Sequence, residues 1–504
     1  MHGICLSANM NLFIQQSFMA EINVSNKDEV FIKVDCDNGI AKEIAEYFTF
    51  YVPGYKFMPA FKNKMWDGKI RLFNYQARLI YKGLLTHVKN FAKKRNYTIS
   101  IEDGLNETQD ISLNDAKKKF KDLPLTPRDY QYKAFLHAVR NKRSVILSPT
   151  ASGKSLIIYM LCKWYKGRKL IIVPTTSLVH QMDSDFISYG QTNYTHKIMA
   201  GQEKNADAEI FISTWQSIYK QPKKWFDQFD VVIGDEAHLF KAQSLTKIMT
   251  KLEDCPFRYG FTGTLDDTQT HRLVLEGLFG PVMRVIKTQE LIENKTLSDF
   301  RIKALVLKYP DEMKKSLAKA SYQNEINFLI SNPARNKFIK DLTLSREGNT
   351  LLLFQMVEKH GRVLYDDINS DTEMRKVFFV YGGVDAETRE EIREITEQEK
   401  DAIIVASYGT FSTGINIKNL HNIIFASPSK SRIRNLQSIG RGLRRSDKKE
   451  SATLYDIADD LCWKSWNNHT LKHLAIRLKM YREEDFTFKL YNIRLNHDTH
   501  AQIN

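Results

Sequence analysis

Residues 148–155 read Ser-Pro-Thr-Ala-Ser-Gly-Lys-Ser, and they stand between a short apolar run and a helix-length apolar run. A strand, a glycine-containing loop ending in Lys-Ser and a helix form the context in which backbone N–H groups cradle phosphates. Gly153 permits the tight turn, Lys154 would reach the β- and γ-phosphates, and Ser155 would place its hydroxyl on Mg²⁺. Ser148 replaces the first glycine of the usual pattern, so a Gly-Lys-Ser turn without a ligand is the alternative. The stretch predicts a nucleoside-phosphate site at the end of a strand.

Two adjacent acids follow another apolar run further along the chain. The run Val231–Ile233 leads into Asp235 and Glu236, the first two residues of an Asp-Glu-Ala-His sequence. Neighbouring carboxylates after a buried strand are costly unless a cation or a water needs them. Asp235 suits the Mg²⁺ shell, and Glu236 suits the base that orients an attacking water. An acidic helix start is the alternative, but the phosphate loop upstream favours the catalytic interpretation.

Short apolar runs bounded by turn residues recur along the chain, with helix-length segments between them. They form two series that are separated by a break near residues 280–300. Buried strands that alternate with helices predict parallel sheets, so we expect an α/β protein with two tandem parallel-sheet domains. The expected strands are Val145–Leu147, Leu170–Val173, Glu209–Ile212, Val231–Ile233 and Tyr259–Phe261 in the first series, and Leu351–Phe354, Val377–Val380, Ile403–Val405, Ile423–Phe425 and Ala452–Tyr455 in the second.

The region before residue 102 is basic and rich in aromatic residues. Residues 51–100 hold eleven Lys or Arg against one acid, Asp67, and ten aromatic residues are interleaved with them. Cationic side chains bind phosphates and exposed rings stack on bases, although rings that only form the core of a small domain are the alternative. The expected nucleic-acid contacts are Lys62, Lys64, Trp66, Lys69 and Arg71. The expected elements are strands at Val30–Val34, Lys69–Phe73, Arg78–Tyr81 and Tyr97–Ile101 and helices at Gly39–Phe50 and Leu84–Lys94.

The composition of the 504-residue chain narrows the class of protein. Its net charge of +15 favours a polyanionic partner, either nucleic acid or an acidic membrane. No apolar run reaches the ~18 residues that span a bilayer. None of the five cysteines lies within four residues of another, which excludes a zinc ribbon and argues against a disulfide framework. The first 18 residues lack Lys and Arg and make a poor signal peptide. We therefore expect a soluble cytoplasmic protein.

These patterns predict the domain boundaries. We expect a disordered extension over residues 1–18, a small basic α+β nucleic-acid-binding domain over 19–101, a linker with a short helix over 102–127, a first parallel-sheet domain over 128–285, a second over 286–459 and a short helical C-terminal segment over 460–504.

The order and spacing of further segments resemble those of superfamily 2 helicases and translocases. The segments are Arg128–Gln131 (RDYQ), Val173–Leu178 (VPTTSL), Ser213–Ser217 (STWQS), Phe261–Thr264 (FTGT), Ala406–Asn416 (ASYGTFSTGIN) and Gln437–Arg444 (QSIGRGLR), together with the phosphate loop and the Asp-Glu-Ala-His box. The resemblance implies two RecA-like motor domains and ATP with Mg²⁺ as cofactors. It implies Gln131, Thr150, Ser152, Gly153, Lys154, Ser155, Gly414 and Gln437 as nucleotide contacts, Ser155 and Asp235 as metal ligands, His238, Thr262 and Thr264 as coupling residues, and Pro174, Thr175, Thr214, Trp215, Thr410 and Thr413 as nucleic-acid contacts.

Two arginines near the end of the second series suit a transition-state role. Phosphoryl transfer spreads negative charge over the γ-oxygens, and a planar guanidinium from a second domain stabilises it only when the two domains close. Arg441 and Arg444 are three residues apart and share a helix face. We assign the arginine finger to Arg444, with Arg441 sharing the role. A solvated basic helix is the alternative, since residues 430–449 hold eight basic residues and one acid.

The segment Phe61–Leu72 (FKNKMWDGKIRL) resembles the amino-terminal domain of the phage T4 UvsW helicase family, and this resemblance covers nearly the whole chain past Met19. It implies an ATP-dependent DNA helicase that unwinds or branch-migrates forks, Holliday junctions, D-loops and R-loops in recombination, repair and replication restart, in the host cytoplasm if a phage encodes it. Implied partners are branched, forked or single-stranded DNA, RNA–DNA hybrids and recombination proteins, with no membrane. A duplex-DNA translocase without strand separation, an RNA helicase, and an annealing or scaffold protein with a decayed ATP site are the alternatives.

Overall fold

The computed structural model describes residues 21–495 except 106, 240–241, 266–268, 415–416, 418, 428, 444–448 and 450. The chain divides into two compact units, of which the first ends at Met283 and the second begins at Arg284. The short segments Ser148–Lys154 and Gly263–Leu265 group with the second unit. No helix among the described residues is long and apolar enough to cross a membrane. The four cysteines in this part of the chain are free thiols.

The N-terminal part of the first unit is built on a mixed five-stranded sheet with the strand order β5-β6-β2-β1-β7. Its strands are β1 (Ile22–Asn26), β2 (Phe31–Cys36), β5 (Phe73–Asn74), β6 (Leu79–Tyr81) and β7 (Ile99–Ile101), and its helices are α2 (Asn38–Tyr47) and α4 (Leu85–Arg95). β1 runs antiparallel to β2 and parallel to β7. The Asp37 carboxylate caps α2 by accepting the Ile40 N–H at 2.8 Å. The other expected strands and both expected helices are present within a few residues, and β1 is an addition. The expected strand Lys69–Phe73 divides into β4 (Lys69–Arg71) and β5, which belong to different sheets.

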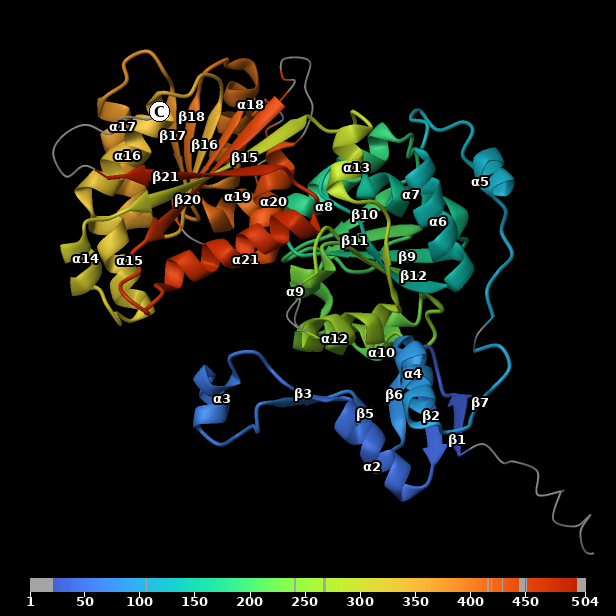
Figure 1. Cartoon of the computed structure of the whole chain (residues 1–504). Helices are drawn as coiled ribbons and strands as arrows, with labels where there is room; N and C mark the ends of the chain where they lie inside the picture. Colours follow the sequence, from blue (N-terminus) through green and yellow to red (C-terminus); the bar gives the residue numbers. More distant parts are fainter. Residues whose placement is uncertain are drawn as a thin grey trace, which may run out of the picture. The chain divides into compact units, whose positions relative to one another are not determined.

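A two-stranded extension, which we call the arm (residues 49–71), projects from this sheet (Figure 1). Its strands β3 (Thr49–Tyr51) and β4 (Lys69–Arg71) pair antiparallel, and η1 (Tyr55–Phe57) and α3 (Pro59–Lys62) lie between them. The Tyr55 ring stacks on Tyr51 at 4.7 Å and meets Phe61 edge-on at 4.8 Å. Gly68 has φ +82°, and a Cβ there would lie 2.3 Å from the Tyr55 ring, so this turn requires glycine.

A seven-stranded sheet with the order β10-β11-β9-β12-β13-β8-β14 forms the rest of the first unit. Its strands are β8 (Arg143–Leu147), β9 (Arg168–Val173), β10 (Thr195–Ile198), β11 (Ile210–Thr214), β12 (Phe229–Gly234), β13 (Phe257–Thr262) and β14 (Val282–Arg284). The first six strands pair in parallel. The helices are α5 (Leu113–Lys119), α6 (Asp129–Asn141), α7 (Lys154–Trp164), α8 (Thr176–Ser188), α9 (Trp215–Ile218), α10 (Lys223–Phe226), η3 (Ala237–Leu239), α11 (Ala242–Met249) and α12 (Gln269–Phe279).

A second seven-stranded sheet with the order β17-β18-β16-β19-β20-β15-β21 forms the second unit. Its strands are β15 (Asp299–Lys308), β16 (Thr350–Phe354), β17 (Val377–Val380), β18 (Ile403–Ser407), β19 (Asn422–Phe425), β20 (Ser451–Asp460) and β21 (Phe488–Arg494). The strands pair in parallel. The helices are α13 (Thr288–Glu293), α14 (Asp311–Ser316), α15 (Tyr322–Ser331), α16 (Pro333–Leu344), η4 (Val357–Gly361), α17 (Arg362–Ser370), α18 (Ala386–Gln398), α19 (Tyr408–Gly414), α20 (Arg432–Gly442) and α21 (His469–Glu483).

The fold class is confirmed, with one correction at the C-terminus. Every expected motor strand falls on a strand of one of the two parallel sheets. The segment after residue 460 holds α21, as expected for a helical segment, but it also holds β21, which pairs with β15 from Ile302↔Phe488 to Lys308↔Arg494. This part of the chain is therefore the edge of the second sheet and not only a helical segment. Its strand is largely exposed, so no apolar run marks it.

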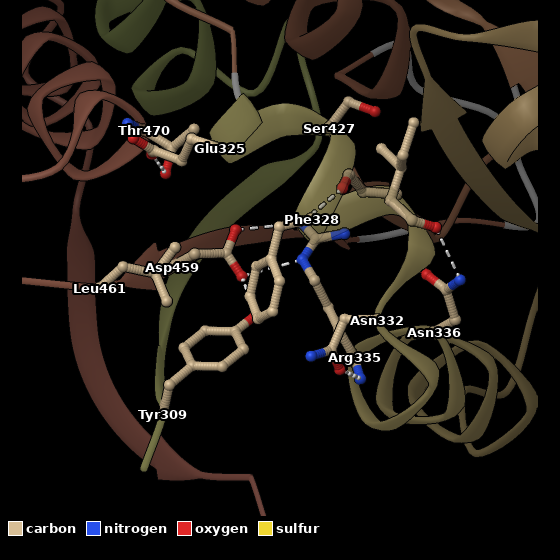
Figure 2. A network of polar contacts seen from close by, with 12 residues as sticks. Tyr309, Glu325, Phe328, Asn332, Arg335, Asn336, Ser427, Asp459, Leu461 and Thr470 are labelled. Atoms are coloured by element: carbon tan, nitrogen blue, oxygen red, sulfur yellow. Dashed lines mark hydrogen bonds and ion pairs between the residues drawn. The ribbon is translucent and has the colours of Figure 1, made fainter. Parts of the chain in front are cut away.

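A buried ionic network stabilises the second unit near the ends of β19 and β20 (Figure 2). Arg335 of α16 and Asp459 of β20 are fully buried. Arg335 Nε donates to Asp459 Oδ1 at 2.8 Å and Nη2 donates to Oδ2 at 3.1 Å. The Tyr309 hydroxyl donates to the same carboxylate at 2.7 Å, and Arg335 Nη2 also donates to the Ala426 carbonyl at 2.8 Å. The network ties α16 to the carboxyl ends of two strands.

Candidate functional site

The loop after β8 has the backbone shape of an anion cradle. Ala151 and Gly153 both have positive φ, at +65° and +78°. The buried Ser152 hydroxyl donates to the Pro149 carbonyl at 2.6 Å and lies 2.6 Å from the Ser148 hydroxyl. These internal bonds hold the loop in a turn from which successive N–H groups can converge on one point. Ser148, which departs from the usual glycine, has a structural role here because it packs on Ser152.

The Thr-Gly-Thr segment after β13 lies beside this loop. A Cβ built on Gly263 would lie 3.6 Å from the Lys154 amine, from the Ser148 carbonyl oxygen and from the Thr150 backbone nitrogen. The Lys154 ammonium and a loop N–H therefore face the same small space, bordered by a residue without a side chain. A cation and N–H donors around such a space suit the phosphates of a nucleotide.

The two expected acids follow β12, which lies next to β13 in the sheet and runs parallel to it. Asp235 is buried, and its backbone N–H donates to the Ile172 carbonyl at 2.9 Å. Glu236 has φ +48°, and this left-handed conformation of a non-glycine residue is typical of functional turns. β8, β13 and β12 are successive parallel strands, so the segments that follow them leave the same edge of the sheet.

A polar chain connects the acid turn to the Thr-Gly-Thr segment. Glu236 Oε2 lies 3.4 Å from His238 Nδ1, and the same nitrogen lies 2.6 Å from the Thr262 hydroxyl. His238 and Thr262 are buried, as is Thr264. The structure thus brings together three residues that the sequence assigned to catalysis and coupling. Their contacts allow a change at Glu236 to reach the end of β13.

Ser155, at the start of α7, has a partner that sequence reasoning missed. Its hydroxyl lies 2.9 Å from the hydroxyl of Tyr189. Burial raises the pKa of Tyr189, although its hydrogen bond with Ser155 opposes this. Tyr189 therefore stays a neutral hydroxyl that can orient the Ser155 oxygen. No motif marks Tyr189, because it lies just beyond the end of α8.

Gln131 lies at the start of α6 with its side chain buried. Its Oε1 accepts the Arg128 backbone N–H at 2.8 Å. This bond caps the helix and fixes the direction of the amide group. The expected contact with adenine remains a prediction.

The threonines expected on a nucleic-acid backbone stand where strands give way to helices. Thr175 caps α8, and its hydroxyl oxygen accepts the Leu178 N–H at 3.4 Å. Thr214 ends β11, with its hydroxyl 2.9 Å from that of Ser217. β9, which leads to Thr175 through the buried Pro174, pairs in parallel with β11. Thr175 and Thr214 therefore share one edge of the first sheet, and Trp215 beside Thr214 is half-buried.

The second unit carries the remaining motor motifs. Thr410 is buried in the first turn of α19, and its Oγ1 accepts the Ser407 hydroxyl at 2.8 Å. Gly414 is the last residue of α19, and Gln437 is buried on α20. The expected arginine finger Arg444 and the side chains of Thr413 and Arg441 lie outside the described part of the chain. Their assignments remain predictions.

The predicted nucleic-acid contacts of the arm differ in exposure and in their side-chain partners. Lys62, the last residue of α3, and Lys64 shortly after it are exposed. Trp66 is half-buried, and its Nε1 donates to the Lys69 carbonyl at 2.9 Å. The Lys69 amine lies 4.9 Å from the centre of the Tyr51 ring. Arg71 pairs with Asp67, and its hydrogen bond to that carboxyl holds the pKa of Asp67 below its usual range. The two lysines near the tip are thus more available to a ligand than Trp66 or Arg71.

The amino-acid sequence matches three family profiles in this order along the chain. They are described as DNA helicase UvsW, N-terminal (residues 21–102), Type III restriction enzyme, res subunit (residues 69–267), and Helicase conserved C-terminal domain (residues 334–446). Together they cover the N-terminal domain, most of the first parallel-sheet domain and the central part of the second.

Known proteins of similar sequence and structure agree with these matches. The ATP-dependent DNA helicase UvsW of Enterobacteria phage T4 is 35% identical over 505 residues, which cover 94% of this chain and 100% of that protein. The crystal structure of T4 UvsW has a TM-score of 0.50 at 33% identity, again over 94% of this chain and 100% of that one. The fold also resembles Dbp5 of Saccharomyces cerevisiae, with a TM-score of 0.52 at 12% identity over 75% of this chain and 93% of that one.

The match to the T4 helicase extends over the full length of that protein, and the UvsW N-terminal profile and the helicase C-terminal profile both match this chain. The chain belongs to the UvsW family of superfamily 2 and is an ATP-dependent DNA helicase.

Proposed function

We propose that this DNA helicase acts on branched DNA, including forks, Holliday junctions, D-loops and R-loops, in recombination, repair and replication restart. R-loops add RNA–DNA hybrids to its substrates, and recombination proteins are its proposed partners in the cytoplasm, which is that of the host cell if a phage encodes the protein. The observation that carries the proposal is the basic arm, which belongs to a domain held firmly against the first motor sheet. A branch has duplex and unpaired segments in different directions, so a second DNA-binding part beside the motor suits it.

Ion pairs within the first unit attach the N-terminal domain to the motor. Arg143 of β8 donates to the Glu29 carboxylate at 2.6 Å, and the Lys82 amine donates to the same carboxylate at 3.0 Å. His87 of α4 pairs with Glu276 of α12. Burial alone would raise the pKa of Glu276, but the hydrogen bonds from His87 and Arg272 lower it overall, so this carboxylate stays ionised.

The backbones also approach closely at this interface. A Cβ on Gly83 would lie 2.0 Å from the Glu276 carbonyl oxygen and 2.7 Å from that of Gly277. α12 is the first helix after the Thr-Gly-Thr segment. A displacement of that segment during hydrolysis would therefore reach the N-terminal domain through one helix. This arrangement supports a function in which the arm and the motor act on the same junction.

The residues of the nucleotide site fit ATP and Mg²⁺. Bound ATP supplies the phosphoryl group whose transfer to water releases energy, and Mg²⁺ neutralises charge on its phosphates. Mg²⁺ prefers oxygen ligands and keeps several waters, so the Ser155 hydroxyl and the Asp235 carboxylate suffice as its protein ligands. Lys154 would hold the phosphates, Glu236 would orient the attacking water, and His238 would pass the change to Thr262. Arg444 and Arg441 would contribute the guanidinium groups.

Strand displacement on matched substrates tests the proposal. ATP hydrolysis and displacement are measured on forked DNA, a four-way junction, blunt duplex DNA and duplex RNA. We expect both activities to be greatest on the forked and four-way DNA. Hydrolysis without displacement on any DNA would mean a duplex translocase, and stimulation by RNA alone would mean an RNA helicase.

The arm is tested by the double variant Lys62→Ala/Lys64→Ala. Its affinity for forked DNA should fall, and the dependence of log K on log salt should flatten by ~0.9 for each phosphate that the arm no longer neutralises. The control is Lys93→Ala/Lys94→Ala, which removes the same charge from exposed positions of α4 in the same domain. Equal reductions in affinity in the two variants would show a general effect of charge and would contradict a specific role of the arm.

A further inference from the structure

A large groove lies in the N-terminal domain where the arm leaves the sheet. It has a volume of about 1060 Å³ and is lined by α2, β3, β4, β5, β6 and Phe31 of β2. Phe31 and Tyr81 are partners in the β2–β6 register, and their rings stack at 5.0 Å in the groove lining. Tyr51 and Tyr75 also line it, with 54% and 42% of their surfaces exposed. Although Tyr51 also stacks on Tyr55, both Tyr51 and Tyr75 keep exposed ring surface in the groove.

Cations accompany the exposed rings. The Lys69 amine lies 4.9 Å from the centre of the Tyr51 ring, and the Arg78 guanidinium lies 5.0 Å from that of Tyr75. Lys42 is exposed on the α2 side of the groove. Among the lining residues, all of which are described, the single acid is Glu46, and the cations are Lys42, Lys69 and Arg71, of which Arg71 is paired with Asp67 outside the lining. The charge of the groove is thus complementary to a polyanion.

Rings beside cations are the combination that binds unpaired nucleic acid. Bases of a single strand expose their faces and stack on aromatic side chains, while the phosphates meet Lys and Arg. The bases of a duplex are already stacked on one another and present only their edges in the grooves. A peptide or another protein would gain less from the surplus of positive charge. The chemistry of the groove favours single-stranded DNA, which every fork and junction opened by a helicase presents.

We propose that this groove binds a short segment of single-stranded DNA, with bases against Tyr51 and Tyr75 and phosphates near Lys42 and Lys69. The inference rests on the proposed function on branched DNA and adds a site to it. The groove would hold one unpaired strand beside the motor while the other strand is translocated. The arm lysines Lys62 and Lys64 are absent from the lining, so the two surfaces can be separated by mutation.

Photocrosslinking of the full-length protein locates the strand. A 15-nucleotide DNA containing 5-iodouracil is irradiated with the protein, which is then digested and analysed by mass spectrometry. We expect crosslinked peptides that contain Tyr51 or Tyr75, in addition to peptides from the motor. Crosslinks confined to motor peptides would overturn the proposal.

Affinity measurements test the role of the rings. Tyr51→Ala/Tyr75→Ala should lower the affinity for the oligonucleotide by about ten-fold, given the usual effect of losing a stacked base. Tyr51→Phe/Tyr75→Phe keeps both rings and should bind like the wild type. An abasic oligonucleotide has the same phosphates but no bases. The wild type should bind it less tightly than the normal oligonucleotide. The wild type and the alanine variant should bind the abasic oligonucleotide with equal affinity. If the alanine variant binds the normal oligonucleotide as tightly as the wild type does, the proposal fails.

The two proposals fail separately. If Tyr51→Ala/Tyr75→Ala binds the oligonucleotide normally while Lys62→Ala/Lys64→Ala binds forked DNA weakly, only the proposal about the groove is overturned. Normal binding and fork displacement by both variants would overturn the contribution of the whole N-terminal domain. Lys42→Ala should lower the affinity for the oligonucleotide, whereas the charge-matched control Lys94→Ala, near the C-terminal end of α4 and outside the groove lining, should not.

Discussion

The buried pair Arg335–Asp459 allows a quantitative prediction for Asp459→Asn. Both side chains are fully buried, and the carboxylate accepts two hydrogen bonds from the guanidinium and one from Tyr309. Asparagine keeps the shape but loses the charge, and its amide nitrogen would face a donor on one side. The guanidinium would then be a buried cation without a counter-charge. Removing one partner of a buried pair costs about 3–5 kcal/mol, so we expect the second unit to lose at least ~3 kcal/mol.

Hydrogen exchange is the appropriate measurement, because a multi-domain chain need not unfold in one step. A loss of ~3 kcal/mol corresponds to about a hundred-fold faster exchange, at 1.36 kcal/mol for each factor of ten. We expect this acceleration for the amides of β16 and β19, which are buried in the second sheet. The amides of β9 and β12 in the first sheet should exchange at the wild-type rate. Equal acceleration in both sheets would contradict a local effect.

A double variant separates charge from packing. Arg335→Met/Asp459→Leu removes both charges and fills the space with apolar side chains, which is often neutral or stabilising for a buried pair. Its second unit should therefore exchange more slowly than that of Asp459→Asn. Tyr309→Phe removes one hydrogen bond and should cost only ~1 kcal/mol. The reasoning would be refuted if Asp459→Asn destabilised the second unit less than Tyr309→Phe does. It would also be refuted if the second unit of Arg335→Met/Asp459→Leu were no more stable than that of Asp459→Asn.

Three other predictions concern the nucleotide site and the second unit. Lys154→Ala should abolish ATP hydrolysis while DNA binding persists; unchanged hydrolysis in a steady-state assay would remove the phosphate-loop assignment. Glu236→Gln should bind ATP but turn over very slowly in a single-turnover assay, and normal turnover would mean another base. Burial and the nearby Arg335 lower the pKa of His360 from about 6.5 to about 3. The contribution of His360 to stability is therefore present above the pKa of the unfolded chain, about 6.5, and is lost as the pH falls from there towards 3. His360→Gln should flatten the fall in stability over that range, measured by urea unfolding at several pH values.

The strands that sequence reasoning missed are strands that no apolar run marks. β18 consists of five buried residues, and the sequence marks it clearly. β15 alternates charged and apolar residues over its first half, because part of that strand is exposed. β21 is mostly exposed at the edge of the sheet, and its residues read like a loop. A strand that is buried on both faces can be recognised in the sequence as an apolar run. An edge strand lacks such a run and forms because it pairs with a neighbouring strand.

The candidate site divides in the same way. The phosphate loop could be predicted because its shape depends on local residues, Gly153 and the serines that bond within the turn. The Tyr189 contact with Ser155 could not be predicted, since it depends on where α8 ends relative to α7. The aromatic groove could not be predicted either, because the sequence shows that aromatic residues are frequent in this region but not which of their rings are exposed.

The threonines at the strand ends illustrate how structural and functional roles can coincide. Thr175 and Thr214 each have a hydroxyl with a partner at a helix start. At Thr175 the contact caps the first turn of α8, where several N–H groups have no partner within the helix and carry the positive end of its dipole. At Thr214 the contact joins two side chains and does not cap α9. A phosphate of the DNA backbone can be held by those N–H groups even when the hydroxyl itself is occupied. The capping role of Thr175 is therefore compatible with the expected contact to a nucleic-acid backbone, because the cap leaves the N–H groups of the first turn of α8 available to a phosphate.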